Sequence, residues 1–163
     1  MAKGAADEFD PSQSSLACNY GRVMSHVLQK GFQAGGVVGL GAVAPVVAFL
    51  EHRKGRTAEE SLPVVAQALC RTALTTLAVS AALGVARLAS VDDLKDGLED
   101  RAYRLHYNQG QNRANLFANL GIAAGGTAAI VCLPASACMV VGGAAAGAAA
   151  GIFAHVATWR KPQ

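Results

Sequence analysis

Long uncharged segments alternate with short polar ones along most of this chain. Four apolar segments, about 31–50, 65–89, 116–133 and 137–158, are long enough to be membrane-crossing helices. A helix rises about 1.5 Å per residue, so about twenty residues cross about 30 Å of hydrocarbon. The first segment has this length and carries no charge. The pattern predicts an all-α protein, an integral membrane bundle of four transmembrane helices.

The last two segments form the least polar part of the chain. From Leu116 to Thr158 there is no Asp, Glu, Lys or Arg, and Pro134 divides the stretch in two. We expect these segments to form a transmembrane hairpin.

Glycines recur at every fourth position in three of the four segments. On a helix this spacing makes a flat stripe, which allows a second backbone to come close. In a water-exposed helix each glycine costs about 1 kcal/mol relative to alanine, so this many glycines need a packing partner. The predicted helix-packing positions are Gly31, Gly35, Gly39, Gly121, Gly125, Gly143, Gly147 and Gly151.

The polar segments define the remaining organisation. Residues 1–30 are predicted to be a polar tail followed either by an interfacial helix or by the first turns of the first span. Residues 31–159 are predicted to form the membrane domain, and residues 160–163 a short tail. Residues 90–115 are predicted to be an extramembrane helix with a loop through Asn108 to Asn112. The early acidic residues do not suit a cleaved signal peptide, so any import signal is expected to be internal. In a four-span topology both termini and 90–115 share one side, which the positive-inside rule makes cytosol-like or matrix-like.

The second segment is the least apolar span, because it contains Gln67, Arg71 and Arg87. An arginine at the centre of a membrane helix costs about 2.5–3.5 kcal/mol on insertion scales. One interpretation starts the span near Arg71. The other has Arg71 facing a partner subunit, a lipid headgroup or a water-filled groove, with Gln67, Thr72 and Thr75 beside it.

The composition of the chain and the scattered positions of its reactive side chains argue against nucleic-acid binding and against catalysis. The chain is 52% hydrophobic and 15% charged with a net charge of +3, which does not favour nucleic acid. Its four cysteines form no CxxC pair: they are small buried residues, or Cys70 forms a disulfide with Cys132 or Cys138. Histidines, acids and nucleophiles form no readable set, so we expect no enzyme, metal, cofactor or small-molecule substrate.

The residues at the start of the third span resemble the motif of a known family. Arg113 is followed by the small-residue run Ala124-Gly125 and Ala129. With its glycine stripes and its polar loop before the third span, the chain resembles the mitochondrial Tim translocase superfamily over about residues 31–158. That motif has an acidic residue four positions after the Arg, where this chain has Phe117, with Asn115 and Asn119 nearby.

The superfamily includes inner-membrane preprotein translocase channels, a plastid outer-envelope amino acid channel and a four-helix accessory subunit of respiratory complex I. The missing acidic residue and the long 90–115 segment, with Tyr103, Arg104, His106 and Tyr107, favour the accessory subunit. The resemblance implies a multi-pass, non-catalytic protein of the mitochondrial inner membrane. It would stabilise the membrane arm of NADH:ubiquinone oxidoreductase and contact other subunits and lipids. The alternative is a Tim-type protein translocase or a small-solute channel of an organelle membrane. Arginines expected at partner or lipid contacts are Arg71, Arg101, Arg104 and Arg113.

Overall fold

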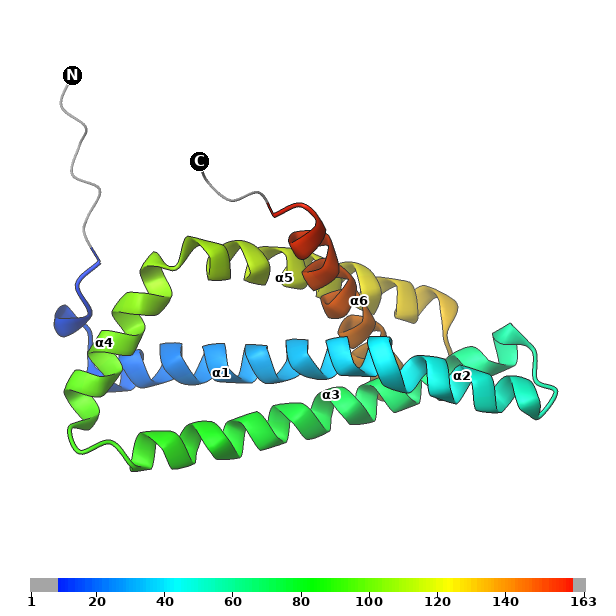
Figure 1. Ribbon diagram of the computed structural model, residues 1–163, viewed down its shortest axis with the longest axis horizontal. Helices are drawn as coiled ribbons and strands as arrows, with labels where there is room; N and C mark the ends of the chain where they lie inside the picture. The colour runs from blue at the N-terminus through cyan, green and yellow to red at the C-terminus, as the bar shows by residue number, and fades with distance from the viewer. Residues whose placement is uncertain (1–8, 160–163) are drawn as a thin grey trace, which may run out of the picture.

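The computed structural model describes residues 9–159, and within them all regular structure is helical (Figure 1). Four helical stretches are long and apolar enough to cross a membrane, which confirms the predicted fold class. The predicted tail 160–163 and the first eight residues lie outside this range. The elements are η1 (Pro11–Gln13), α1 (Leu16–Val38), η2 (Gly39–Val43), α2 (Ala44–Arg53), α3 (Ala58–Ala89), α4 (Leu94–Tyr107), α5 (Gln109–Cys132) and α6 (Ala137–Ala157).

The first membrane helix is one continuous stretch of 38 residues, Leu16–Arg53, made of α1, η2 and α2. Its polar beginning forms the first turns of this helix and not a separate element. The short η2 is a π-helical turn that ends just before Pro45. Proline lacks an N–H and crowds the preceding turn, and a π-turn relieves both effects without ending the helix. The helix therefore continues past its proline into α2.

Two helices begin earlier in the chain than the sequence predicts, because a side chain caps the first turn of each. Thr57 caps α3 and forms a reciprocal capping box with Glu60, so α3 begins well before residue 65. The Asn108 side chain accepts a hydrogen bond from the Gln111 N–H at 3.0 Å and starts α5. The predicted loop through Asn108 to Asn112 is wrong, because a capping asparagine turns the chain within one residue.

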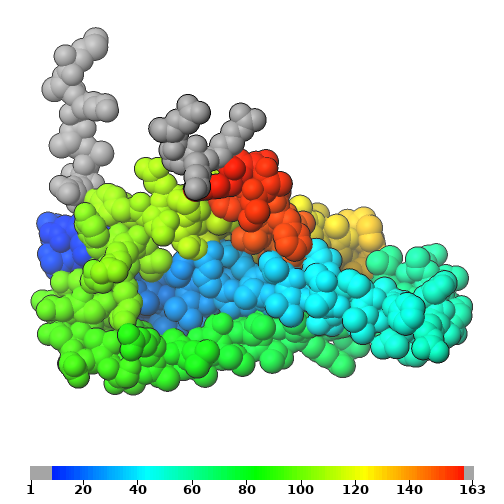
Figure 2. Space-filling model, viewed as in Figure 1, coloured from blue at the N-terminus to red at the C-terminus, as the bar shows by residue number. Residues whose placement is uncertain are grey.

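Two pairs of helices make up the bundle. The first membrane helix runs beside α3, while α6 crosses the bundle and contacts α5, α3 and α1 (Figure 1). Helix α4 joins α3 to α5 at the end of the bundle where α1 begins. In Figure 2 the first helix is visible as a blue to cyan band between α3 and the α5–α6 pair.

The packing is the reverse of a water-soluble bundle. Most buried apolar side chains between the spans are alanines, whereas large side chains such as Val131 (77% exposed) and Leu83 (66%) face outward. Lipid is as apolar as these side chains, so a membrane helix loses nothing by exposing them and gains by packing small residues. A cluster of larger buried side chains lies where α4 meets α1 and α3, and comprises Val23, Leu88 and Leu98.

Candidate functional site

Helices α5 and α6 meet through their glycines, backbone against backbone. A Cβ placed on Gly147 would overlap the carbonyl oxygen of Gly121, and one on Gly125 would overlap that of Gly143. A Cβ on Gly151 would overlap the carbonyl oxygen of Phe117. The two stripes therefore face each other along the hairpin, where any side chain would push the helices apart.

The third stripe faces α3. A Cβ on Gly31 would lie 2.6 Å from Ser80 Oγ, one on Gly35 would lie 2.6 Å from Ala73 Cα, and one on Gly39 would lie 2.8 Å from Leu69 Cδ2. All eight glycines of the stripes thus lie where another helix approaches. Sequence reasoning missed three more such positions. Gly36 and Gly142 stand one residue away from the repeats, and at Gly84 of α3 a Cβ would lie 2.9 Å from Val27 Cγ1 of α1.

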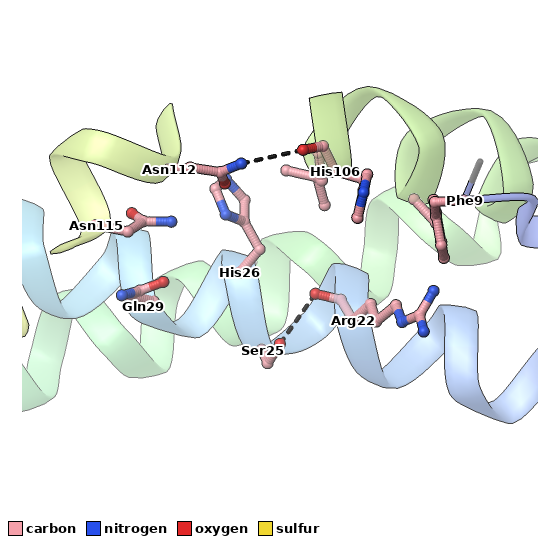
Figure 3. Close-up of a pocket in the computed structure, with 10 residues that line it drawn as sticks. Phe9, Arg22, Ser25, His26, Gln29, His106, Asn112 and Asn115 are labelled. Carbon is pink, nitrogen blue, oxygen red and sulfur yellow. Dashed lines mark hydrogen bonds between the residues drawn. The ribbon is translucent and has the colours of Figure 1, made fainter. Parts of the chain in front are cut away.

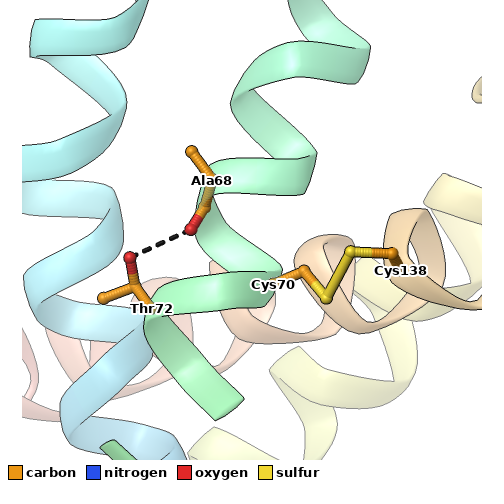
Figure 4. The surroundings of a disulfide bond; sticks show 4 residues. All are labelled: Ala68, Cys70, Thr72 and Cys138. Carbon is orange, nitrogen blue, oxygen red and sulfur yellow. Dashed lines mark hydrogen bonds between the residues drawn. A yellow bond between two sulfur atoms is a disulfide. The ribbon is translucent and has the colours of Figure 1, made fainter. Parts of the chain in front are cut away.

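A disulfide joins α3 to α6 (Figure 4). It links Cys70 to Cys138, whose Cα atoms are 5.6 Å apart. Cys132, the other candidate partner, is exposed and unpaired, as is Cys18. The bridge fastens the α5–α6 hairpin to the first pair of helices, and structural disulfides of this kind form in oxidising compartments.

The outer face of α3 carries a polar stripe, formed by Gln67, Arg71 and Thr75, which are four residues apart and all exposed. The contacts of Gly35 and Gly39 with α3 place Arg71 beside the middle of the uncharged segment 31–50. Within residues 9–159 no carboxylate forms an ion pair with it.

Thr72 does not belong to this polar stripe. It is half-buried toward the first helix, and its hydroxyl donates to the Ala68 carbonyl oxygen at 2.9 Å (Figure 4). Such a bond satisfies a hydroxyl within its own helix. Of the four residues grouped in the sequence, Gln67, Arg71 and Thr75 therefore share the outer face of α3, and Thr72 does not.

The three other predicted contact arginines bond within the chain. Arg104 Nε donates to Asp100 Oδ1 at 2.9 Å, one turn away on α4. Arg101 Nη1 lies 3.4 Å from the Gly97 carbonyl oxygen. Arg113 Nη2 reaches α6, where it donates to Thr158 Oγ1 at 3.0 Å. Of the four, only Arg71 is left facing outward without a bond among the described residues.

Arg113 and Phe117 also form a contact of their own. The Arg113 Cζ atom lies 5.0 Å from the centre of the Phe117 ring. This is a cation–π contact within α5, and such contacts are worth about 0.5–1 kcal/mol at an exposed site. The connection from Arg113 to the end of α6 is the hydrogen bond to Thr158.

Amide side chains connect α1 to α5 in a way that the sequence did not reveal. Gln29 Nε2 donates to Asn119 Oδ1 at 2.9 Å, and Gln33 Nε2 donates to Asn115 Oδ1 at 3.3 Å. Gln33 is only 4% exposed. The available signal was the four-residue spacing of each pair on its own helix, which puts its two amides on one face.

Comparison with known proteins gives a family without an activity. Residues 20–157 match a family described as a protein of unknown function, DUF1757. The chain belongs to the DUF1757 family. No curated protein matches it.

The DUF1757 match runs from the first turn of α1 to the end of α6, so it includes the glycine contacts, the disulfide and the polar stripe on α3. Within residues 9–159, no group of three or more His, Cys, Asp or Glu side chains is placed to hold a metal ion.

Proposed function

We propose that this DUF1757 protein is a non-catalytic structural subunit of a larger membrane assembly. In its specific form, the proposal is an accessory subunit that stabilises the membrane arm of mitochondrial respiratory complex I in the inner membrane. Its partners would be other subunits of that complex and membrane lipids.

One observation carries the general proposal: Arg71 is exposed on the outer face of α3, at mid-span, between Gln67 and Thr75. Leu74 beside it is 49% exposed, so this side of α3 otherwise has the apolar surface that lipid requires. A guanidinium in lipid at this depth costs about 2.5–3.5 kcal/mol, whereas one paired with a neighbouring helix does not. A partner helix that offers a carboxylate or carbonyl oxygens would remove the cost.

The interior of the bundle supports a packing role. Backbone contacts between α5 and α6 leave no room for even a methyl group at the paired glycines. The disulfide then fixes this hairpin to α3. Rigid, closely packed helices of this kind present a fixed outer surface to neighbouring subunits.

The respiratory part of the proposal is supported by the sequence resemblance. In that resemblance Arg113 stands at the motif position, and in this chain it donates to Thr158 and contacts the Phe117 ring. The translocase members would be expected to keep the acidic residue of the motif, so Phe117 at that position favours the accessory subunit.

The test is co-migration on a native gel from membranes solubilised in mild detergent. The protein should run in fixed ratio with respiratory complex I, and Arg71→Gln should lower the fraction in the assembled band. Arg87→Gln is the matched control, because Arg87 is exposed near the end of the same helix.

Equal assembly of the two variants would remove the argument from Arg71. A wild-type protein that migrates alone would overturn the structural role altogether, and co-migration with another large complex would overturn only the respiratory assignment.

A second candidate is the Tim-type translocase or small-solute channel, because the same stripe of Gln67, Arg71 and Thr75 would line a passage formed with further copies. Purified protein reconstituted alone in a planar bilayer separates the two functions. Conductance that changes with Arg71→Gln favours the channel, and an electrically silent bilayer favours the structural subunit.

A further inference from the structure

A polar pocket lies between α1, α4 and α5 (Figure 3). Its volume is about 250 Å³. Figure 3 shows side chains from α1 and from the α4–α5 corner directed into the same space. Its lining includes Phe9, Arg22, His26, His106, Asn112 and Asn115.

Among the described residues, the lining of this pocket includes basic side chains and no acidic ones. Arg22 and His26 come from α1, and His106 comes from α4. Lys30 stands one turn after His26, and its ammonium group donates to Gln33 Oε1 at 2.6 Å. The guanidinium of Arg22 faces a cavity with no carboxylate among its described lining residues, so it creates a positive potential there, which attracts anions.

Existing hydrogen bonds leave donors turned toward the cavity. Because Asn115 Oδ1 accepts from Gln33, the Asn115 NH₂ group is left to point into the pocket, as Figure 3 shows. The His106 carbonyl oxygen would repel an anion, but it already accepts from Asn112 Nδ2 at 3.0 Å. The free groups of the lining include the N–H donors of Arg22 and Asn115, the kind that oxyanions bind, beside the amide oxygens of Gln29 and Asn112.

An aromatic wall orients the arginine. The Arg22 Cζ atom lies 4.5 Å from the centre of the Phe9 ring, and Phe9 stacks on His106 with ring centres 4.4 Å apart. A cation–π contact occupies the face of a guanidinium and leaves its in-plane N–H groups available. Arg22 is therefore held in place and can still donate two parallel hydrogen bonds to an oxyanion.

The height of the pocket indicates what kind of oxyanion is close by. Arg22 and His26 lie in the polar turns of α1 directly before Gly31, where the uncharged segment begins. Lipid headgroups lie at this boundary between the apolar span and water. From this position and these donors, we propose that the pocket lined by Arg22, His26, His106 and Asn115 binds a phosphate group. The group is either the headgroup of an anionic lipid or a free phosphate ester, and this function is separate from the structural role of Arg71.

The test measures binding to the purified full-length protein in neutral detergent. Calorimetric titration compares dioctanoyl phosphatidic acid with dioctanoylglycerol, which has the same acyl chains and no phosphate. Glycerol 3-phosphate and inorganic phosphate form the third arm. The variants are Arg22→Gln, Arg22→Lys and Asn115→Ala, with Arg87→Gln as a control that removes one positive charge outside the pocket. Circular dichroism and gel filtration check that each variant is folded.

We expect phosphatidic acid to bind and dioctanoylglycerol not to bind. Arg22→Gln should weaken binding at least tenfold, the order expected when one charge-assisted bidentate contact is lost, and Arg22→Lys should recover part of it. Arg87→Gln should leave the affinity unchanged. Binding of phosphatidic acid without glycerol 3-phosphate identifies a lipid as the source, and comparable binding of both identifies the phosphate ester itself.

Two results would overturn the proposal. One is that none of the three phosphate compounds binds, or that dioctanoylglycerol binds as tightly as phosphatidic acid. The other is an equal loss of affinity in Arg22→Gln and Arg87→Gln, which would mean that only the overall charge matters. Because neither result involves native-gel assembly, failure here leaves the structural role of the protein intact.

Discussion

Two adjacent glycines of α5 allow a sharp test of the close helix contact. A Cβ on Gly125 would overlap the Gly143 carbonyl oxygen and lie 3.0 Å from Gly147 Cα. A Cβ on Gly126 would meet only the side chains of Ala144 and Val140, both at 3.9 Å. Gly125→Ala and Gly126→Ala therefore add the same methyl group to the same helix, one at a closed position and one at an open position.

The size of the difference follows from the distances. Optimal carbon contacts are about 3.5–4.0 Å long, so a methyl at Gly125 requires α5 and α6 to separate by about 1 Å. A gap of this size forfeits about a quarter to a half of the dispersion attraction at each contact, and overpacking typically costs about 1–3 kcal/mol. We expect Gly125→Ala to lower the free energy of unfolding by about 2 kcal/mol relative to Gly126→Ala, within the same overpacking range.

The assay is reversible unfolding in detergent by added dodecyl sulfate. Trp159, the single tryptophan, lies two residues after the end of α6 and reports on that helix by fluorescence. Gly125→Ala should unfold at a lower denaturant fraction than either Gly126→Ala or the wild type. Identical midpoints for the two variants would refute the inference that backbone contact between α5 and α6 stabilises the bundle.

Further predictions concern the disulfide, the buried carboxylate of Glu51 and the side chain of Arg113. Cys70→Ser should lower stability by about 4 kcal/mol in the same titration, since the bridge closes a sequence separation of 68 residues; no change would mean that the thiols are reduced in the purified protein. A hydrogen bond from Lys54 lowers the pKa of Glu51 from 4.5, aided by the charge of Arg56 and opposed by burial. Stability from Glu51 is therefore complete above pH 4.5 and is lost as the pH falls through its lower folded-state pKa, so Glu51→Gln should flatten the acid limb of thermal denaturation. Arg113→Lys should cost about 1 kcal/mol and shift the tryptophan emission, because lysine cannot keep both the aromatic and the hydrogen-bonding contacts; an unchanged spectrum would contradict this role.

The sequence by itself determined the helices of this protein and the kind of surface each one needs. Uncharged stretches of about twenty residues predict spans because length and hydropathy are properties of one segment. The four-residue glycine repeats predict packing faces for the same reason, since a helix turns residues four apart onto one side. Helix ends were less predictable: polar composition suggested a loop after Asn108, whereas one capping hydrogen bond starts α5 there.

Only the tertiary structure decided how these faces meet. Loop parity places Cys132 and Cys138 toward the same side, but the rotation of α6 against α3 brings Cys138 to Cys70 and leaves Cys132 exposed. The rotation of α3 about its own axis turns Thr72 toward α1 and Arg71 outward, so these two neighbours do not share a face. The phosphate pocket joins residues of α1 and α5 that are far apart in the chain. Such pairings depend on the relative rotation and height of whole helices, which many contacts set together and no single segment encodes.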